Sequence, residues 1–366
     1  MSTSLDRKTP ALALSGGGFR ATLYHCGALL RLNELGWLSR ISRISSVSGG
    51  SIASGMLAVA WPKLVQADGR FTNLDTEVIE PLRAFCRRNI DERAVAWGTI
   101  HPGKSIGDVL ADFYDDMFLG KTLDDLPQAP QFVFNATNLQ TGRLVRIAKI
   151  GLREYTIGQI ALPDLRIAVA VAASSAFPPV LSPVEIAVNP DNWIDLGGAS
   201  HFGDPNYTGR LSLTDGGAYD NLGLETVDDF DPVIVSDAGA PFGTAESASA
   251  FWPKQAMRAL DIATDQARAL RKRLLFAECE ASDRQAAYAG IDGDITRYTA
   301  PQTLTADPRL VKSLARLRTR LNPFSDEEQG RLINWGWLMM DVALRGRVSR
   351  DQAAPTAWPI PAFPLG

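Results

Sequence analysis

Two short apolar runs near the start of the chain each stop at a serine followed by glycines, and each turn leads into a helix-like segment. Residues 11–14 are followed by the letters SGGG (15–18), and residues 41–47 are followed by SGG (48–50). The segment after the first turn has apolar residues at helical spacing, and the segment after the second is apolar on every side. This repeated strand–turn–helix unit predicts an α/β fold in which helices cover a sheet.

The rest of the chain adds further strands and helices. Apolar runs bounded by turn residues predict strands at residues 131–137, 184–188, 210–214 and 233–235. Composition and spacing predict helices at residues 164–173 and 254–280 and within 308–347. Residues 63–130 are more polar and contain scattered aromatic side chains, so we expect helices and loops set over the sheet. The proline-rich tail, 351–366, is expected to be extended or loosely packed.

Composition argues against several kinds of protein. The formal net charge of the 366 residues is −4, which argues against nucleic acid as the main partner because phosphate binding needs a basic surface. Three cysteines, Cys26, Cys86 and Cys279, are too few and too far apart to indicate a disulfide framework or a zinc site. Residues 1–9 do not resemble a signal peptide, and no apolar run approaches membrane-spanning length. We therefore expect a soluble, cytoplasmic protein with no transmembrane segment.

The literal serine-esterase pattern G-x-S-x-G occurs once, at residues 103–107, with Ser105 at its centre. A strand must lead into such a serine, but only a turn precedes Ser105, so we do not assign the chemistry to it. The same stretch satisfies the phosphate-loop pattern from Gly98 to Ser105, again without a well-formed strand before it. Asp237, after the apolar run 233–235, would be the matching magnesium-binding carboxylate. A phosphate-loop NTPase therefore stays open as an alternative.

Ser48 has the surroundings that an activated serine needs. A strand leads into it, a buried helix follows it, and Gly49 and Gly50 have no Cβ atoms to block close approach of the strand and the helix. The positive end of the helix dipole would face the hydroxyl. Ser46 stands where the elbow pattern has glycine, so some backbone strain is expected there. The alternative interpretation is a serine that caps a buried helix.

The glycines after the first strand predict an oxyanion hole. Adjacent N–H groups of Gly16, Gly17 and Gly18 can point at one spot without side chains in the way. A dinucleotide-binding loop fits less well, because the next strand offers no acidic residue. Arg20, in the first turn of the following helix, would be free to hold an anionic group, or it is simply a solvated arginine at a helix start.

The general base is identified by elimination. The chain has three histidines, His25, His101 and His201, and a serine–acid–histidine order would need His201 with an earlier acid such as Asp195. Asp215 ends a predicted strand just before two glycines, at a bend that exposes its carboxylate. Alone, Asp215 would be an ordinary turn residue. Beside a serine elbow and a glycine triplet, it becomes the preferred base.

Four motifs in this order, SGGGFRA, SVSGGS, ASSAFPP and TDGGAYDN, resemble those of patatin-like phospholipases, and the first two resemble the cytosolic phospholipase branch. The resemblance extends over about residues 10–240, with a less specific helical continuation to about residue 346. Two positions depart from the family pattern. Ser46 replaces the first glycine of the elbow, and Ala21 replaces the last glycine of the glycine-rich loop.

The resemblance implies a three-layer α/β/α patatin-like sheet with a helical cap and C-terminal helices. The catalytic domain would span residues 10–240 and include a cap insertion at about 63–130. A helical extension, 241–350, would pack on the same domain, ahead of the tail. The aromatic-rich stretch from Trp97 to Phe118 is our candidate for the surface that covers the site and admits a lipid, or else its aromatic residues are simply packed under the cap.

The resemblance also implies a function, a phospholipase A-type serine esterase that hydrolyses acyl lipids. Ser48 would be the nucleophile, Asp215 its base, Gly16 to Gly18 the oxyanion hole and Arg20 a contact for the substrate phosphate. Such a dyad needs no cofactor and no metal, and we expect no calcium dependence. The substrate would be a phospholipid or another acyl lipid at a membrane surface, so the protein would be cytoplasmic or peripheral at the membrane. A catalytically silent lipid-binding scaffold remains a second alternative.

Overall fold

The computed structural model describes residues 9–90, 106–301 and 303–366. The phosphate-loop stretch from Gly98 to Ser105 lies outside the described residues, and so does His101. The aromatic-rich stretch predicted to cover the site is described only from residue 106 onward.

The centre of the molecule is a ten-stranded sheet whose middle part is parallel. The parallel strands lie in the order β12 (Ala286–Gly290), β11 (Val233–Asp237), β1 (Ala11–Leu14), β2 (Arg43–Ser46) and β5 (Gln131–Asn138). Leu14 pairs with Ser46 on one side and with Ser236 on the other. The turns that follow β1, β2 and β11 therefore meet at one edge of the sheet.

Antiparallel strands extend the sheet beyond β5. They are β6 (Leu144–Ala148), β7 (Gly151–Glu154) and β8 (Gly158–Ile160). The last residues of β5 also pair with β10 (Arg210–Asp215), which in turn pairs with β9 (Val184–Ala187). Because Asp215 pairs with Ala136 of β5, and β5 is the neighbour of β2, the end of β10 is brought toward the turn after β2. A separate hairpin consists of β3 (Gln66–Ala67) and β4 (Arg70–Phe71).

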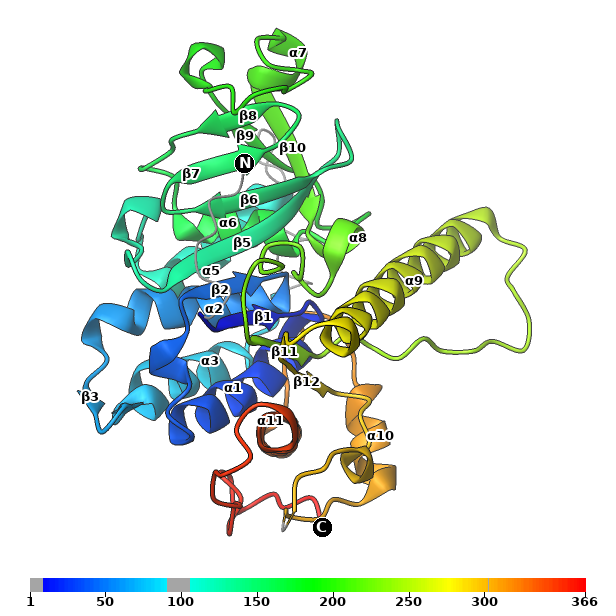
Figure 1. Ribbon diagram of the computed structural model, residues 1–366. Coiled ribbons are helices and arrows are strands. Elements are labelled where there is room, and N and C mark those ends of the chain that lie inside the picture. Colours follow the sequence, from blue (N-terminus) through cyan, green and yellow to red (C-terminus); the bar gives the residue numbers. More distant parts are fainter. Residues whose placement is uncertain (1–8, 91–105, 302) are drawn as a thin grey trace.

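Helices cover both faces of the sheet and give the predicted three layers (Figure 1). One layer consists of α1 (Gly18–Glu34), α2 (Gly49–Ala60), α3 (Glu80–Phe85), α5 (Ile106–Phe118), α6 (Ile167–Ser175) and α11 (Asp326–Arg347). The other face carries α8 (Gly217–Asp220) and α9 (Trp252–Ala281). Leu12 and Leu14 pack in the first layer and Ala11 and Ala13 in the second, as the two-residue period of a strand requires. The short helices α7 (Pro205–Thr208) and α10 (Pro308–Ala315) complete the set.

Helix α1 lies between the sheet and α11, and its residues 18–33 are all buried. The two helices approach to backbone contact, which only glycine permits. A Cβ at Gly27 would lie 1.9 Å from the Ile333 carbonyl oxygen, and one at Gly336 would lie 1.9 Å from the Tyr24 carbonyl oxygen. Helix α11 is therefore part of the same core as the first strands.

The sequence patterns missed the strands β6, β7, β8 and β12. Strand β12 reads AAYAG, and alanine and glycine have little strand preference of their own, so its conformation depends on pairing with β11. Arg146 of β6 and Arg153 of β7 lie opposite each other, and charged residues within short runs hide the apolar alternation.

The tail, predicted to be extended or loosely packed, has no regular structure but is attached to the core. Residues 351–366 contain no helix or strand, but Leu365 is only 1% exposed. The Asn334 amide of α11 donates hydrogen bonds to the carbonyl oxygens of Ile360 and Phe363. The tail is therefore fixed to the core by apolar burial and by one buried amide.

Among residues 9–90, 106–301 and 303–366, no helix has the length and apolar character needed to cross a bilayer. Within the same ranges, no three side chains of His, Cys, Asp or Glu gather in a way that could hold a metal ion.

Candidate active site

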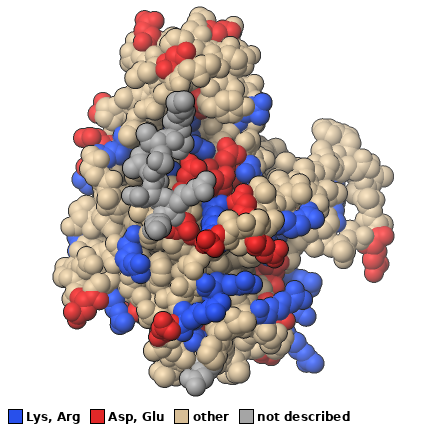
Figure 2. All heavy atoms as spheres, in the orientation of Figure 1, with Lys and Arg blue, Asp and Glu red and all other residues tan. Residues whose placement is uncertain are grey.

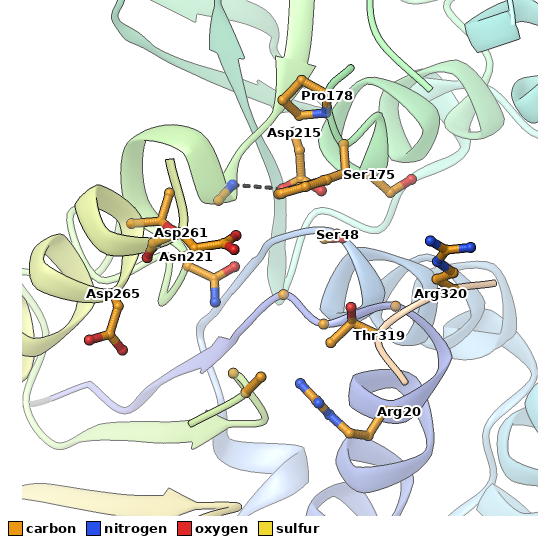
Figure 3. Close-up of a pocket in the computed structure, with 18 of the residues that line it drawn as sticks. Arg20, Ser48, Ser175, Pro178, Asp215, Asn221, Asp261, Asp265, Thr319 and Arg320 are labelled. Carbon is orange, nitrogen blue, oxygen red and sulfur yellow. Dashed lines mark hydrogen bonds between the residues drawn. The ribbon is translucent and has the colours of Figure 1, made fainter. Parts of the chain in front are cut away.

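A cavity of about 860 Å³ lies beside the carboxyl ends of β1 and β2 (Figure 3). Its floor contains the glycine turn 16–18, Ser48 and Asp215, three features that were predicted separately from the sequence. Its walls come from residues 175–181, 239–243 and 319–322 and from one side of α9. Crevices at the carboxyl ends of parallel strands are the usual ligand sites of α/β sheets.

Ser48 stands on a strained turn between β2 and α2. Its backbone has φ 52° and ψ −119°, a left-handed conformation that costs a non-glycine residue about 1–3 kcal/mol. Close packing explains the glycines that follow, since a Cβ at Gly49 would lie 2.1 Å from the Gly18 carbonyl oxygen and one at Gly50 would lie 2.4 Å from that of Leu14. Ser48 is 8% exposed as a residue, and the turn places it in the lining of the cavity.

The replacement of the elbow's first glycine by Ser46 does not strain the backbone, contrary to expectation. Ser46 ends β2 without a positive φ. Its hydroxyl donates a hydrogen bond to the Val133 carbonyl oxygen at 3.2 Å and accepts one from Ser51 at 3.0 Å. A buried hydroxyl with both partners is tolerated, so the strain is confined to Ser48.

Asp215 ends β10 next to Ser48 and is 2% exposed. Burial raises the pKa of its carboxyl to about 6, although hydrogen bonds from the Gly217 amide and the Ser48 side chain favour the charged form. The Gly217 N–H donates to Oδ1 at 2.7 Å. A carboxylate with this pKa is ionised at neutral pH and still basic enough to accept a proton.

The three glycines after β1 have different environments. The Gly16 N–H donates to the Asn221 carbonyl oxygen at 3.1 Å, so the prediction that it belongs to the oxyanion hole is wrong. Gly16 instead allows close approach, because a Cβ there would lie 2.3 Å from Asn221 Oδ1. Gly17 and Gly18 have φ of 143° and 58°, and their N–H groups find no acceptor in the described part of the chain. They stand at the positive end of α1.

Arg20 is buried rather than open to a ligand. Its guanidinium donates hydrogen bonds to the carbonyl oxygens of Ala315 at 3.2 Å, Leu317 at 2.8 Å and Ala238 at 2.8 Å. It is 1% exposed, and burial lowers its pKa to about 10. The expectation of a free anion-binding side chain does not fit this geometry.

The described histidines do not line the cavity. His25 lies below the glycine turn, where Nε2 donates to the Ser15 carbonyl oxygen at 2.9 Å and Nδ1 accepts from the Ser236 hydroxyl at 2.8 Å. Burial lowers the pKa of His25 to about 4, so it stays neutral. His201 stacks on Tyr207, with ring centroids 4.0 Å apart. Neither histidine is placed to act on Ser48.

The stretch from Trp97 to Phe118 is predicted either to cover the site or to pack under the cap, and its described part, 106–118, agrees with the second alternative. No described residue of this stretch lines the cavity, and Tyr114 and Phe118 are fully buried in the helical layer. Asp237, the suggested magnesium ligand, is buried and already pairs with Arg268 and accepts a hydrogen bond from the Tyr288 hydroxyl.

Sequence reasoning did not single out Asn221, the inner side of α9 or the segment 319–322. Asn221 could have been found, because it ends the motif TDGGAYDN. The inner side of α9 and the segment 319–322 have no sequence pattern that would identify them as part of a site.

Comparisons with known proteins find a matching family model and solved structures with a similar fold. A family model described as patatin-like phospholipase matches residues 12–228. A structure of human GIVD cytosolic phospholipase A2 in complex with methyl gamma-linolenyl fluorophosphonate is similar with a TM-score of 0.53 and 15% identity, covering 92% of this chain and 57% of that one. A second structure of human GIVD cytosolic phospholipase A2 gives a TM-score of 0.50 and 13% identity, covering 93% of this chain and 62% of that one. The chain thus spans less than two thirds of the length of these structures. No curated protein sequence matches it.

Proposed function

The chain belongs to the patatin-like phospholipase family, and on that premise we propose that it is a serine esterase that hydrolyses acyl esters of lipids. The observation that carries the proposal is the strained Ser48 beside a buried Asp215 at the floor of one cavity. A serine held in an unfavourable backbone conformation next to a carboxylate is the arrangement expected of an activated nucleophile.

The proposed reaction uses the two side chains in turn. Asp215 accepts the hydroxyl proton while Ser48 Oγ attacks the ester carbonyl carbon, which gives a tetrahedral intermediate. The C–O bond to the leaving alcohol then breaks, and the alcohol takes the proton from Asp215. Water repeats the sequence on the acyl-enzyme, releasing a fatty acid and restoring Ser48.

The oxyanion of each tetrahedral intermediate needs hydrogen-bond donors. We assign this role to the N–H groups of Gly17 and Gly18, which have no other acceptor in the described part of the chain and stand at the N-terminus of α1. Backbone donors held in place before the reaction cost no reorganisation when the charge develops. The mechanism therefore requires neither a histidine nor a metal ion.

The cavity has the size and lining expected for an acyl lipid. Its volume of about 860 Å³ lies within the usual range for small-molecule sites, about 300–1,000 Å³. Apolar side chains of the lining include Phe177, Val180, Leu181 and, on α9, Met257. These side chains would hold the fatty acyl chain while Ser48 attacks its ester.

Exposed apolar side chains near the cavity support action at a membrane surface. Phe177, Val180 and Phe242 line the cavity and are 42%, 48% and 38% exposed. Phe251 and Trp252 are exposed at the start of α9, which projects from the body (Figure 1) with a mostly uncharged far end (Figure 2). Apolar groups of this kind favour contact with a lipid interface. Phospholipids and other acyl lipids are therefore the proposed substrates.

A fluorophosphonate probe tests the proposal directly. An activated serine displaces fluoride from the probe and becomes covalently labelled through its oxygen. We expect Ser48→Ala to abolish labelling and to lower hydrolysis of a short-chain nitrophenyl ester by a factor of about a million, as removal of a serine nucleophile does elsewhere.

Ser175→Ala is the matched control. Ser175 lines the same cavity, but its hydroxyl donates to the Val171 carbonyl oxygen at 2.7 Å. This variant should keep both labelling and activity. Labelling that persists in Ser48→Ala would show that another residue, such as Ser105, is the nucleophile. A wild-type protein that is neither labelled nor active would instead favour the silent scaffold.

A further inference from the structure

One polar side chain at the floor of the cavity takes no part in the reaction proposed above. Asn221 follows the short helix α8 and lines the cavity together with Ser48 and Asp215 (Figure 3). Its backbone carbonyl oxygen accepts the Gly16 N–H, but its side-chain amide has no hydrogen bond within the described part of the chain. An amide has an acceptor oxygen and two N–H donors, and here all of them are open to water.

Two glycines bring the oxygen of this amide close to both members of the proposed dyad. A Cβ at Gly16 would lie 2.3 Å from Asn221 Oδ1 and 3.1 Å from the Cβ of Ser48. A Cβ at Gly217 would lie 2.6 Å from Asn221 Oδ1 and 3.0 Å from Asp215 Oδ1. The amide oxygen is therefore a near neighbour of the nucleophile and of the carboxylate that serves as its base.

The backbone around Asn221 is held in place on both sides. The residue before it, Asp220, is 1% exposed, and its carboxylate accepts hydrogen bonds from the N–H groups of Leu222 and Glu225, each at 3.0 Å. The bond from Gly16 to the Asn221 carbonyl oxygen adds a third contact. A side chain on a backbone fixed in this way can position a small molecule with little loss of its own freedom.

Other polar groups near the dyad already have a partner or a role. The Ser175 hydroxyl donates to the Val171 carbonyl oxygen at 2.7 Å. The N–H groups of Gly17 and Gly18 are donors only, and the proposed reaction uses them for the oxyanion. Asn221 Oδ1 is thus an acceptor beside the dyad that remains open to water.

Hydrolysis of an acyl-enzyme needs an acceptor at this place. The attacking water has two O–H groups that need acceptors while a lone pair points at the acyl carbon. The Ser48 side chain donates a hydrogen bond to Asp215 before the reaction, but it cannot do so once its oxygen is esterified. Asp215 can then accept one hydrogen of the water and take it as a proton. The second hydrogen needs another acceptor nearby, and Asn221 Oδ1 is in position to accept it.

We propose that Asn221 positions the water that hydrolyses the acyl-enzyme and thereby favours hydrolysis over transfer of the acyl group to an alcohol. The inference rests on the proposed serine esterase function. In this step the water oxygen bonds to the acyl carbon while Asp215 takes one water proton. The bond between that carbon and Ser48 Oγ then breaks, and Ser48 Oγ takes the proton from Asp215 as the carboxylic acid leaves. An alcohol has a single O–H group, which Asp215 uses, so it gains nothing from the second acceptor.

The test measures how the acyl-enzyme divides between water and methanol. The protein is given nitrophenyl butyrate in buffer that contains methanol, and the initial ratio of methyl butyrate to butyric acid is measured by gas chromatography. This ratio does not depend on how fast the acyl-enzyme forms. Asn221→Ala should raise the ratio about tenfold, because one hydrogen bond to the attacking water is lost. The rate of fluorophosphonate labelling, which involves no water, should change less than about threefold.

Two other variants serve as controls. Asn221→Asp keeps an acceptor oxygen on a side chain of the same size, and its ratio should stay within about threefold of the wild-type ratio. Thr319→Val removes an exposed hydroxyl of the cavity lining, on a segment that contacts Gly18, and should leave the ratio unchanged. Labelling by the fluorophosphonate shows in each variant that the protein is folded and that Ser48 is still active.

Several results would overturn the inference. If Asn221→Ala slows labelling and hydrolysis equally and leaves the ratio unchanged, Asn221 only supports the glycine turn. A ratio that rises as much in Thr319→Val would mean that the water is held elsewhere in the cavity. A ratio that rises as much in Asn221→Asp would show that the acceptor oxygen is not what matters. A wild-type protein that resists labelling and releases no butyric acid fails the proposed function itself, whereas a labelled, active protein with one ratio in all variants fails only the water site.

Discussion

The carboxylate of Asp215 is fully buried, and burial raises its pKa to about 6 from the usual 3.8. The folded protein therefore binds this proton more tightly than the unfolded chain does. Above about pH 6 the folded state holds a charge that burial disfavours. This cost decreases as the pH falls from 6 toward 4 and is absent below about 4. A group that is useful to catalysis is thus unfavourable to stability at neutral pH.

We expect Asp215→Asn to abolish activity and to stabilise the protein at pH 8. The gain has an upper limit of about 3 kcal/mol, from 1.36 kcal/mol per pKa unit. The difference in unfolding free energy between the variant and the wild type should shrink toward zero at pH 4. Chemical denaturation of both proteins across this range measures it, and His25, which titrates in both, cancels in the difference. A difference that does not change with pH would contradict the raised pKa.

Helix α9 supplies one wall of the cavity, but little of the surface of the helix is buried. Leu275 is the one residue of α9 that is buried. A buried ion pair holds it in place, because Arg268 contacts Asp237 at the end of β11. Burial alone would raise the pKa of Asp237, but Arg268, the Tyr288 hydroxyl and the Gly239 N–H outweigh it and lower the pKa. The position of the wall thus depends on a few polar contacts more than on a large apolar face.

Asp237→Ala should therefore loosen α9. Removing one partner of a buried ion pair costs up to about 3–5 kcal/mol, and Arg268 would keep only its contact with Asp265 of the same helix, at 3.4 Å. We expect faster hydrogen exchange along α9 and a lower unfolding temperature. Arg273→Ala, at an exposed position of the same helix, is the control and should change neither. Unaltered exchange in α9 of the Asp237 variant would show that other contacts hold the helix.

The region after residue 240 completes the fold of the region before it. Strand β12 is an edge of the central sheet, and α11 covers α1. Asp341 of α11 receives Arg31 of α1 at 2.7 Å and Arg345 at 2.9 Å. We therefore propose that residues 10–240 and 241–350, which the sequence suggests as a catalytic domain and its extension, fold as one unit.

A chain ending at residue 240 should accordingly fail to fold. It would expose the face of α1 that α11 covers and leave Arg31 without its buried partner. Near-ultraviolet circular dichroism should show no fixed aromatic environment, and calorimetry of the full chain should show one transition. A truncated chain that folds and is labelled by a fluorophosphonate, or two separate transitions in the full chain, would mean two independent units.

The sequence alone determined the features in which a local conformation requires a particular residue. A Cβ at Gly50 would collide with the backbone of β1. The turn around Ser48 therefore requires glycine there, and this requirement is visible in the sequence. Asp215 can be recognised from its neighbours in the same way as Ser48, because it ends a strand and is followed by glycines that must pack closely. The order of strands, turns and helices around these positions predicted an α/β fold with helices covering a sheet and both members of the proposed dyad, and the family resemblance added the three-layer arrangement.

Only the tertiary structure decided what surrounds these residues. Arg20 has the same chemistry whether it is solvated or buried, and its acceptors Ala238, Ala315 and Leu317 lie more than 200 positions away. The same holds for Thr319, whose carbonyl oxygen approaches Gly18 of the glycine turn because of how α10 and α11 pack. The sequence does not show which backbone carbonyl oxygen will accept a hydrogen bond from a distant side chain, because every residue type has the same peptide oxygen. Long-range contacts of this kind arise from the path of the chain, so they become visible only when the whole chain is folded.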